Sequence, residues 1–222
     1  MRILELFSEI YGTENIERFK SFLNTYENQD IKYELNEEDS FLISYGDSLK
    51  SEKKGFDSLF TTLREEVGSS IKNVHILPMY PYTSDDGFSV VDYEQVRDDL
   101  GSWADLNKYS NEYGLMYDFV INHMSKSSEW FQEFLKGNNN YFVEYDESFN
   151  YNNVVRPRVS PLFHEIGGKN VWTTFSEDQV DLNFKEYEVF EEATRILIDY
   201  CKNGATFIRL DAIGFMWKES GT

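Results

Sequence analysis

Residues 206–212 read TFIRLDA, a short apolar run that ends in an arginine and an aspartate. The run follows residues 189–200, in which apolar side chains such as Ile196 and Tyr200 recur at helical spacing. A helix that leads into a short apolar strand is the repeating unit of α/β folds with a parallel sheet. This stretch therefore predicts that residues 206–210 form a parallel strand packed against the preceding helix.

The same alternation of strand and helix occurs earlier in the chain. Apolar runs at 41–45, 74–77 and 115–121 predict three further strands. Helical patterns at 56–67 and 105–113 lie between them. Four such units in series predict an α/β fold in which helices pack on a parallel sheet.

One long segment interrupts this alternation. About 65 residues, 124–188, separate the third predicted strand from the next helix, whereas ordinary βα loops contain roughly 2–6 residues. We therefore expect an inserted subdomain at the C-terminal side of a strand, where parallel folds usually place function. At the start of the chain, residues 3–26 predict a helical pair, and the acidic stretch 27–40 predicts a connector.

The charge of the chain excludes several classes of partner. Forty acidic residues oppose 21 basic ones among 222, which gives a formal net charge of −19, so nucleic acid and anionic membrane surfaces repel the protein. A single cysteine, Cys201, allows no internal disulfide and no zinc site of the CxxC type. The N-terminal apolar stretch contains Glu5 and Glu9, unlike a signal peptide. These features predict a soluble, cytoplasmic protein.

Arg209 and Asp211 stand where the last predicted strand ends. Residues two apart in a strand point to the same face, so we expect the two side chains to be neighbours. A guanidinium group favours the ionised form of an adjacent carboxyl, which is the form that a carboxylate nucleophile requires. The alternative interpretation is a structural ion pair.

Two other predicted strands also end in polar residues. His123, after the third strand, is suited either to a substrate hydroxyl or to a satisfied position in the core. Asp85 and Phe88, in the turn after the second strand, provide a carboxylate and a ring of the kind that bind sugars; the alternative is an ordinary charged turn. Because strand ends converge on one pocket in a βα barrel, the three sites together favour a functional site.

Several segments resemble one enzyme family. DFVINH at 118–123, QVDLN at 179–183 and IRLDA at 208–212 resemble signature segments of the α-amylase superfamily, glycoside hydrolase family 13. SDDGFSVVDY at 84–93 and FMWKE at 215–219 resemble the sucrose phosphorylase subgroup, and within it the glucosylglycerate phosphorylases.

The resemblance implies a TIM-type (β/α)8 barrel, of which this chain supplies about the first four βα units. We expect a helical extension and connector at 1–40, the first part of the catalytic barrel at 41–123, an inserted subdomain at 124–188, and a truncated continuation of the barrel at 189–222. The chain then corresponds to the N-terminal part of a longer enzyme, and the isolated part is expected to be inactive.

The resemblance also implies a retaining double displacement through a glucosyl-enzyme. Asp211 matches the family's nucleophile, and Arg209 matches the arginine that orients it and keeps it ionised. His123 matches the histidine that binds the donor glucose. Asp85 matches the carboxylate that grips the outer glucose hydroxyls, and Phe88 matches the ring beneath the sugar.

On the acceptor side, Gln179 matches an acceptor-site residue and Arg158 matches an arginine that contacts phosphate. Alternatively, Arg158 pairs with acids of the insert such as Glu144 or Asp146. No residue of the chain matches the family's acid/base glutamate, which follows the fifth strand of the barrel. Asn122 matches a calcium ligand of α-amylases, but the phosphorylase subgroup implies neither a metal nor a cofactor.

The activity implied is that of an α-glucoside phosphorylase. Such an enzyme transfers glucose from a small glucoside, of the glucosylglycerate or sucrose type, to inorganic phosphate and releases α-glucose 1-phosphate. The alternatives are an α-glucoside hydrolase, a transglucosidase of the same superfamily, or a catalytically inactive binding protein. The acceptor stays open among glycerate, fructose, fructose phosphate and glycerol.

Overall fold

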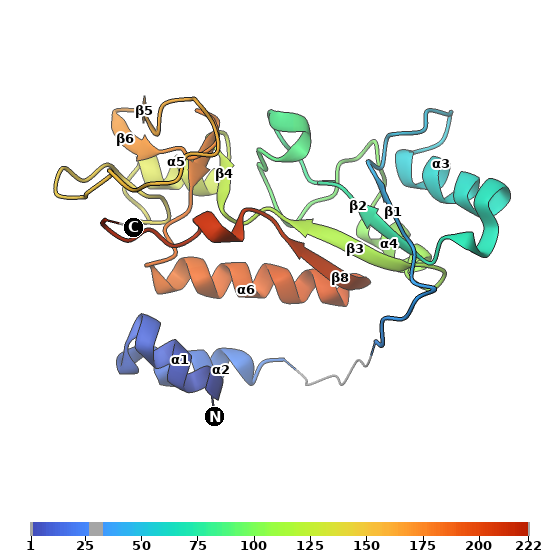
Figure 1. The fold of residues 1–222 in the computed structure, drawn as a ribbon, viewed down its shortest axis with the longest axis horizontal. Coiled ribbons are helices and arrows are strands. Elements are labelled where there is room, and N and C mark those ends of the chain that lie inside the picture. Colours follow the sequence, from blue (N-terminus) through green and yellow to red (C-terminus); the bar gives the residue numbers. More distant parts are fainter. Residues whose placement is uncertain (1, 27–32, 222) are drawn as a thin grey trace.

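A four-stranded parallel sheet forms the centre of the computed structural model, which describes residues 2–26 and 33–221. The strand order is β1-β2-β3-β8 (Figure 1). The strands are β1 (Phe41–Ser44), β2 (Asn73–Ile76), β3 (Gly114–Phe119) and β8 (Ala205–Leu210). All three strand pairs are parallel. The four strands predicted from the apolar runs are therefore confirmed.

Three helices pack against this sheet. They are α3 (Gly55–Thr62), α4 (Trp103–Tyr109) and α6 (Tyr187–Lys202). Stacked aromatic rings connect these helices. Phe60 of α3 stacks on Tyr109 of α4, with ring centroids 4.1 Å apart. Tyr200 of α6 stacks on Tyr80, which follows β2, with centroids 5.2 Å apart. These rings are fully buried, so much of the aromatic content of the chain belongs to the core.

Three details of the prediction were wrong. The helix predicted at 105–113 is α4, which begins at Trp103 and ends at Tyr109. The α-helical hydrogen bonding of the predicted helix at 56–67 ends at Thr62, and wider turns run over Leu63–Val67. The helical pattern places Val67 on the same face as Phe56 and Leu63, which are buried, but the Val67 side chain is exposed. The third strand ends at Phe119 rather than residue 121, so Asn122 lies in a turn. In a continuous strand, the side chains of Asn122 and His123 would point to opposite faces of the sheet. Because Asn122 lies in a turn, this rule does not apply to the two residues.

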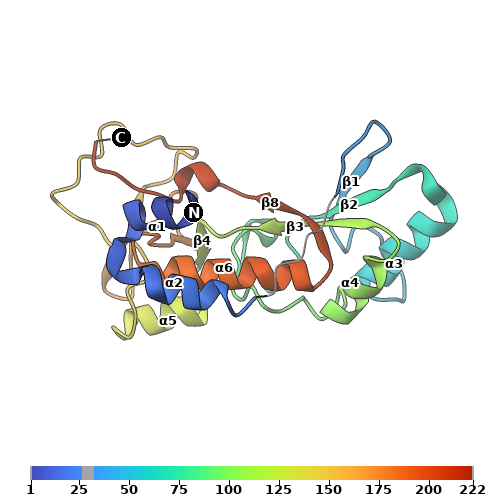
Figure 2. The same ribbon diagram turned by 90° about the horizontal axis from the view of Figure 1, so that it is seen from below.

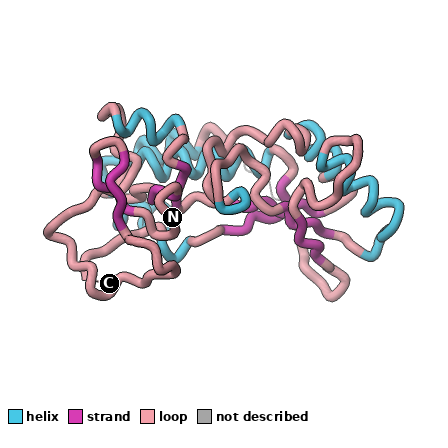
Figure 3. The backbone as a smooth tube through the Cα atoms, turned by 90° about the horizontal axis from the view of Figure 1, so that it is seen from above, coloured by secondary structure: helices cyan, strands magenta, loops and turns pink. Residues whose placement is uncertain are grey.

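The inserted segment forms two small antiparallel sheets and one helix. Strand β4 (His123–Ser125) pairs with β7 (Gln179–Asp181), and β5 (Phe163–Ile166) pairs with β6 (Lys169–Trp172). Helix α5 (Glu129–Leu135) precedes the second pair. Figure 3 shows these short strands apart from the main sheet. The insert thus has its own secondary structure beyond the C-terminal ends of β3 and β8.

The N-terminal residues form a helical pair, α1 (Arg2–Tyr11) and α2 (Ile16–Leu23). The pair packs along α6, below it in Figure 1 and over it in Figure 2. Phe7 stacks on Phe19 at 4.1 Å and meets Tyr187 edge-on at 5.4 Å. Of the predicted connector, residues 27–32 lie outside the described residues.

The main sheet is open at both edges. Among the described residues, β1 pairs only with β2 and β8 only with β3. Ile43 of β1 is 63% exposed and Leu210 of β8 is 46% exposed. The four strands therefore form an open sheet rather than a closed barrel. Within the described part, no helix is both long and apolar enough to cross a membrane.

Candidate active site

One cleft of about 330 Å³ opens at the C-terminal ends of the main strands. Its lining comprises Tyr45, Asp85, Asp86, Phe88, His123, Arg158, Phe175, Gln179, Arg209 and Asp211. All seven residues named from the sequence are in this set. The structure thus brings together side chains from the segments after β2, β3 and β8 and from the insert.

Arg209 holds two carboxylates at the C-terminal end of β8. Its Nη1 atom lies 2.9 Å from Oδ1 of Asp211 and also donates to Oδ1 of Asp118, the register partner of Arg209 on β3. The other oxygen of Asp118 lies 2.6 Å from Nε2 of His75. Partial burial opposes the charge of Arg209, but its hydrogen bonds and its attraction to Asp118 and Asp211 prevail and raise its pKa. Arg209 therefore remains a cation beside Asp211.

His123 begins strand β4 and is almost fully buried. Its Nε2 lies 2.8 Å from the carbonyl oxygen of Phe88, and its Nδ1 lies 3.1 Å from Nδ2 of Asn122. Burial lowers the pKa of His123, which favours the neutral ring. A neutral ring that donates from Nε2 and accepts at Nδ1 satisfies both contacts. The ring thus has the partners of a core histidine and also lines the cleft.

The turn after β2 has an unusual backbone. Asp85 and Asp86 have φ values of 55° and 48°, and Gly87 has a φ of 104°. Positive φ is costly for residues with a Cβ atom, so surrounding contacts must hold the turn. One such contact comes from the insert, where Nε2 of Gln179 donates to Oδ2 of Asp85 at 2.9 Å. Gln179 is thus attached to the side of the cleft that holds Asp85.

Arg158 lies in an exposed loop of the insert and reaches the same cleft. Among the described residues it forms no ion pair. Glu144 pairs instead with Lys169 at 2.7 Å, and Asp146 accepts hydrogen bonds from Ser148. The alternative partners predicted for Arg158 are therefore taken by other groups. Its guanidinium is the cleft's second cation after that of Arg209, within the part of the chain that is described.

No role was assigned from the sequence to three lining residues, Tyr45, Asp86 and Phe175, although Asp86 belongs to the polar turn identified after the second strand. Tyr45 follows β1, so the strand-end argument applied to the first strand could have found it. Burial, together with the nearby acids, raises the pKa of its phenol. The Phe175 ring centroid lies 5.1 Å from that of His123. No local signal in the sequence identifies Phe175, because its position depends on how the insert folds back.

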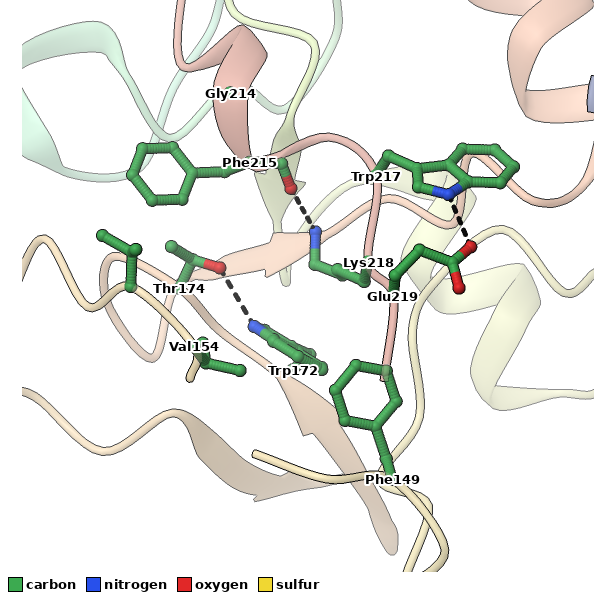
Figure 4. Close-up of a pocket in the computed structure, with 10 residues that line it drawn as sticks. Phe149, Val154, Trp172, Thr174, Gly214, Phe215, Trp217, Lys218 and Glu219 are labelled. Carbon is green, nitrogen blue, oxygen red and sulfur yellow. Dashed lines mark hydrogen bonds between the residues drawn. The ribbon is translucent and has the colours of Figure 1, made fainter. Parts of the chain in front are cut away.

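A second pocket, of about 140 Å³, lies between the insert and the segment after β8. Figure 4 shows Phe149, Trp172 and Phe215 around it, with the Lys218 ammonium pointing toward the Phe215 carbonyl oxygen, 2.6 Å away. The same ammonium lies 2.9 Å from Oδ2 of Asp181, and the Lys218 and Asp181 side chains are only 9% and 0% exposed. This buried ion pair ties β7 of the insert to the segment that follows Asp211.

No group of three or more His, Cys, Asp or Glu residues in the described ranges, 2–26 and 33–221, is arranged to hold a metal ion. The cleft offers one aspartate beside an arginine, a neutral histidine, further carboxylates, aromatic rings and a second arginine. An ionised aspartate positioned by an arginine is suited to nucleophilic attack.

Comparisons with known proteins point to one family. The family described as "Alpha amylase, catalytic domain" matches residues 67–222. A glucosylglycerate phosphorylase of Allomeiothermus silvanus is 45% identical over 195 residues, which cover 84% of this chain and 35% of that protein. A glucosylglycerate phosphorylase of Spirochaeta thermophila is 42% identical over 244 residues, covering 100% of this chain and 41% of that protein.

A solved structure agrees with the sequence matches. The crystal structure of sucrose 6F-phosphate phosphorylase from Thermoanaerobacter thermosaccharolyticum matches with a TM-score of 0.73 at 27% identity, covering 85% of this chain and 42% of that one. This chain thus spans about 35–42% of the length of these relatives, and its four-stranded sheet corresponds to part of a (β/α)8 barrel. Because the family match covers most of the chain, this protein belongs to the α-amylase catalytic-domain family.

Proposed function

We propose that this chain supplies the nucleophile side of the active site of an α-glucoside phosphorylase. The observation that carries the proposal is the single cleft shared by Asp211, Arg209 and Arg158. In the complete enzyme, Asp211 attacks the anomeric carbon of the donor glucose, the bond from that carbon to the aglycone oxygen breaks, and a glucosyl-enzyme forms. Phosphate then attacks the same carbon, which releases α-glucose 1-phosphate and regenerates the Asp211 carboxylate.

Each remaining side chain has a role in this proposal. Asp85 and His123 bind the hydroxyls of the donor glucose, and Phe88 packs against its apolar face. Gln179 holds Asp85 in place and borders the acceptor. The acid/base glutamate that protonates the leaving group, which retaining mechanisms require, is supplied by a part of the complete enzyme outside this chain. No metal and no cofactor are proposed.

Arg158 supplies a positive charge that can bind phosphate in a protein whose net negative charge repels anions. The chain carries a net charge of −19, so a phosphate dianion approaches the cleft only where a local cation attracts it. The planar guanidinium group can bind two phosphate oxygens at once. Arg158 forms no ion pair with the other described residues, so its charge is available to an anion in the cleft.

Glucosylglycerate is the proposed donor. Three relatives named glucosylglycerate phosphorylase are 37–45% identical to this chain, whereas those named sucrose phosphorylase are 27–32% identical. The same proposal includes the predicted division of the chain into a helical extension, a barrel part and an insert. It also includes the predicted cytoplasmic location.

The test is to incubate the complete enzyme with glucosylglycerate and phosphate and to measure α-glucose 1-phosphate, with sucrose in parallel. We expect phosphate-dependent release of the α-anomer from glucosylglycerate. Release of free glucose at a rate independent of phosphate would instead indicate a hydrolase. Transfer to sugars without phosphate would indicate a transglucosidase.

A further inference from the structure

Asp178, at the edge of the insert, is surrounded by hydroxyl groups from two other segments. Its Oδ2 atom accepts hydrogen bonds from Thr83 and Ser84, both at 2.5 Å, and from Ser89 at 2.8 Å. Its Oδ1 atom accepts from Ser125 at 3.1 Å. A carboxylate is an acceptor-only group with room for several donors. The half-buried Asp178 carboxylate thus accepts hydrogen bonds from four hydroxyl groups that are far from it in the sequence.

These contacts flank the strained turn described above. Thr83 and Ser84 directly precede Asp85, and Ser89 directly follows Phe88. The turn between them contains two aspartates at positive φ, a conformation that persists only when its surroundings enforce it. The fourth hydroxyl, on Ser125, belongs to β4, the strand that begins with His123. Asp178 therefore joins the turn to the strand that carries the histidine.

The electrostatics favour the charged form of Asp178. Burial acts to raise its pKa, but the hydrogen bonds from the four hydroxyls outweigh burial and lower the pKa. Hydrogen bonds to an ionised acceptor are stronger than those between neutral groups. The carboxylate is thus a strong tether for a turn that would otherwise relax.

We infer that Asp178 is a positioning residue, which fixes the turn bearing Asp85 and Phe88 against the strand bearing His123. The side chain does not line the cleft, so it acts through these residues rather than on the sugar. The inference rests on the proposed function, because it assigns Asp178 to the donor-glucose side of that site. It separates the role of Asp178 from that of its neighbour Gln179, which lines the cleft itself.

The experiment compares three variants of the complete enzyme: Asp178→Ala, Asp178→Asn and Glu177→Gln. Glu177 is the matched control, because its exposed carboxylate pairs only with Lys126 among the described residues. We expect Asp178→Ala to lower kcat/KM for the glucoside by about 10- to 100-fold, with KM for the glucoside raised. Asp178→Asn keeps one acceptor oxygen, so its kcat/KM should lie between the values of wild type and Asp178→Ala. The kcat/KM of Glu177→Gln should match that of wild type.

The ratio of phosphorolysis to hydrolysis distinguishes a role on the donor side of the site from a role on the acceptor side. Because Asp178 acts on the donor side, we expect this ratio at a fixed phosphate concentration to stay unchanged in Asp178→Ala. Unaltered donor kinetics in this variant would overturn the inference. A shifted ratio would place Asp178 on the acceptor side and would overturn it as well.

Amide hydrogen exchange tests whether Asp178 holds the turn in place, even if the wild-type enzyme shows no phosphorolysis. The amides of Thr83, Phe88, Ser89 and Val91 donate to carbonyl oxygens within the turn region. We expect exchange in a peptide covering residues 81–91 to be about tenfold faster or more in Asp178→Ala, and unchanged in Glu177→Gln. Equal protection in wild type and Asp178→Ala would refute the positioning role, whereas an inactive wild type with this exchange difference would refute only the proposed function.

Discussion

Nη1 of Arg209 lies 2.9 Å from Oδ1 of Asp211. The same guanidinium is held from the other side by the buried carboxylate of Asp118, which His75 contacts in turn. Arg209 is thus anchored within the sheet before it reaches Asp211. A cation fixed in this way holds the Asp211 carboxylate in position without having to be ordered when the substrate binds.

Replacing Asp211 by asparagine preserves the shape of this group and removes its nucleophile. We expect Asp211→Asn in the complete enzyme to lower turnover by several orders of magnitude, because an amide cannot form the glucosyl-enzyme. Glucose binding, measured by calorimetry, should survive because the surrounding contacts remain. Glu17→Gln on the exposed face of α2 is a suitable control, and a variant that kept a substantial fraction of wild-type turnover would exclude Asp211 as the nucleophile.

Replacing Arg158 by alanine should affect phosphate and spare the donor glucose. A charged hydrogen bond contributes about 1.5–3 kcal/mol, or roughly ten- to over a hundredfold in affinity, and we expect Arg158→Ala to weaken phosphate use by about that factor. Water should then capture more of the intermediate. Phosphorolysis and hydrolysis are measured together across phosphate concentrations.

Arg156 offers a matched control for that experiment. Its guanidinium donates to the Ser160 carbonyl oxygen within the same loop and does not line the cleft. Arg156→Ala should leave the phosphate dependence close to that of wild type. If both variants shifted it equally, the loop conformation rather than the Arg158 charge would be responsible.

Stability should depend on pH through His123. Burial lowers its pKa in the folded protein, whereas the unfolded chain titrates near its ordinary value of about 6.5. Below that pH the unfolded state binds more protons, so the free energy of unfolding falls as the pH falls, by at most about 1.4 kcal/mol per pH unit from this group. Between pH 7 and pH 5, the free energy of unfolding measured with urea should fall less steeply in His123→Gln than in wild type. Equal slopes of this free energy against pH in the two proteins would contradict the prediction.

The 222-residue chain alone should associate and lack phosphorolysis. The edges of β1 and β8 have no partner among the described residues, and Ile43 and Leu210 are exposed there. Open edges of this kind pair with other chains. Size-exclusion chromatography with light scattering checks the association. A stable, monodisperse monomer that released α-glucose 1-phosphate would refute both expectations.

The sequence predicted the main sheet well because each strand is a compact apolar run between polar segments. Strand β2 is buried along its whole length and requires such a run, and helices of the expected spacing separate the strands. The exposed Val67 marks the limit of this method. Its place in the helical pattern indicates an inward side chain, but the helical turns widen after Thr62, which changes the direction in which later residues point.

The site was predictable where chemistry follows a strand directly. Asp85, His123 and Asp211 each stand within a short distance of a strand end, so one geometric argument brings them together. Asp178 offered no such signal, because its significance lies in hydroxyls up to 95 residues away in the sequence. Contacts of that range depend on how the insert folds back over the strand ends, and local patterns carry no record of it.

The helical pair at the N-terminus has a consequence for how the protein is made. Tyr11 donates its hydroxyl proton to the carbonyl oxygen of Phe184, 173 residues later in the chain, and Phe7 and Phe19 pack on Tyr187. At roughly 5–20 residues per second, a ribosome needs about 9–35 s to synthesise the intervening segment. Tyr11, Phe7 and Phe19 thus leave the ribosome well before the partners that cover them, and nascent-chain chaperones can reach them throughout that interval.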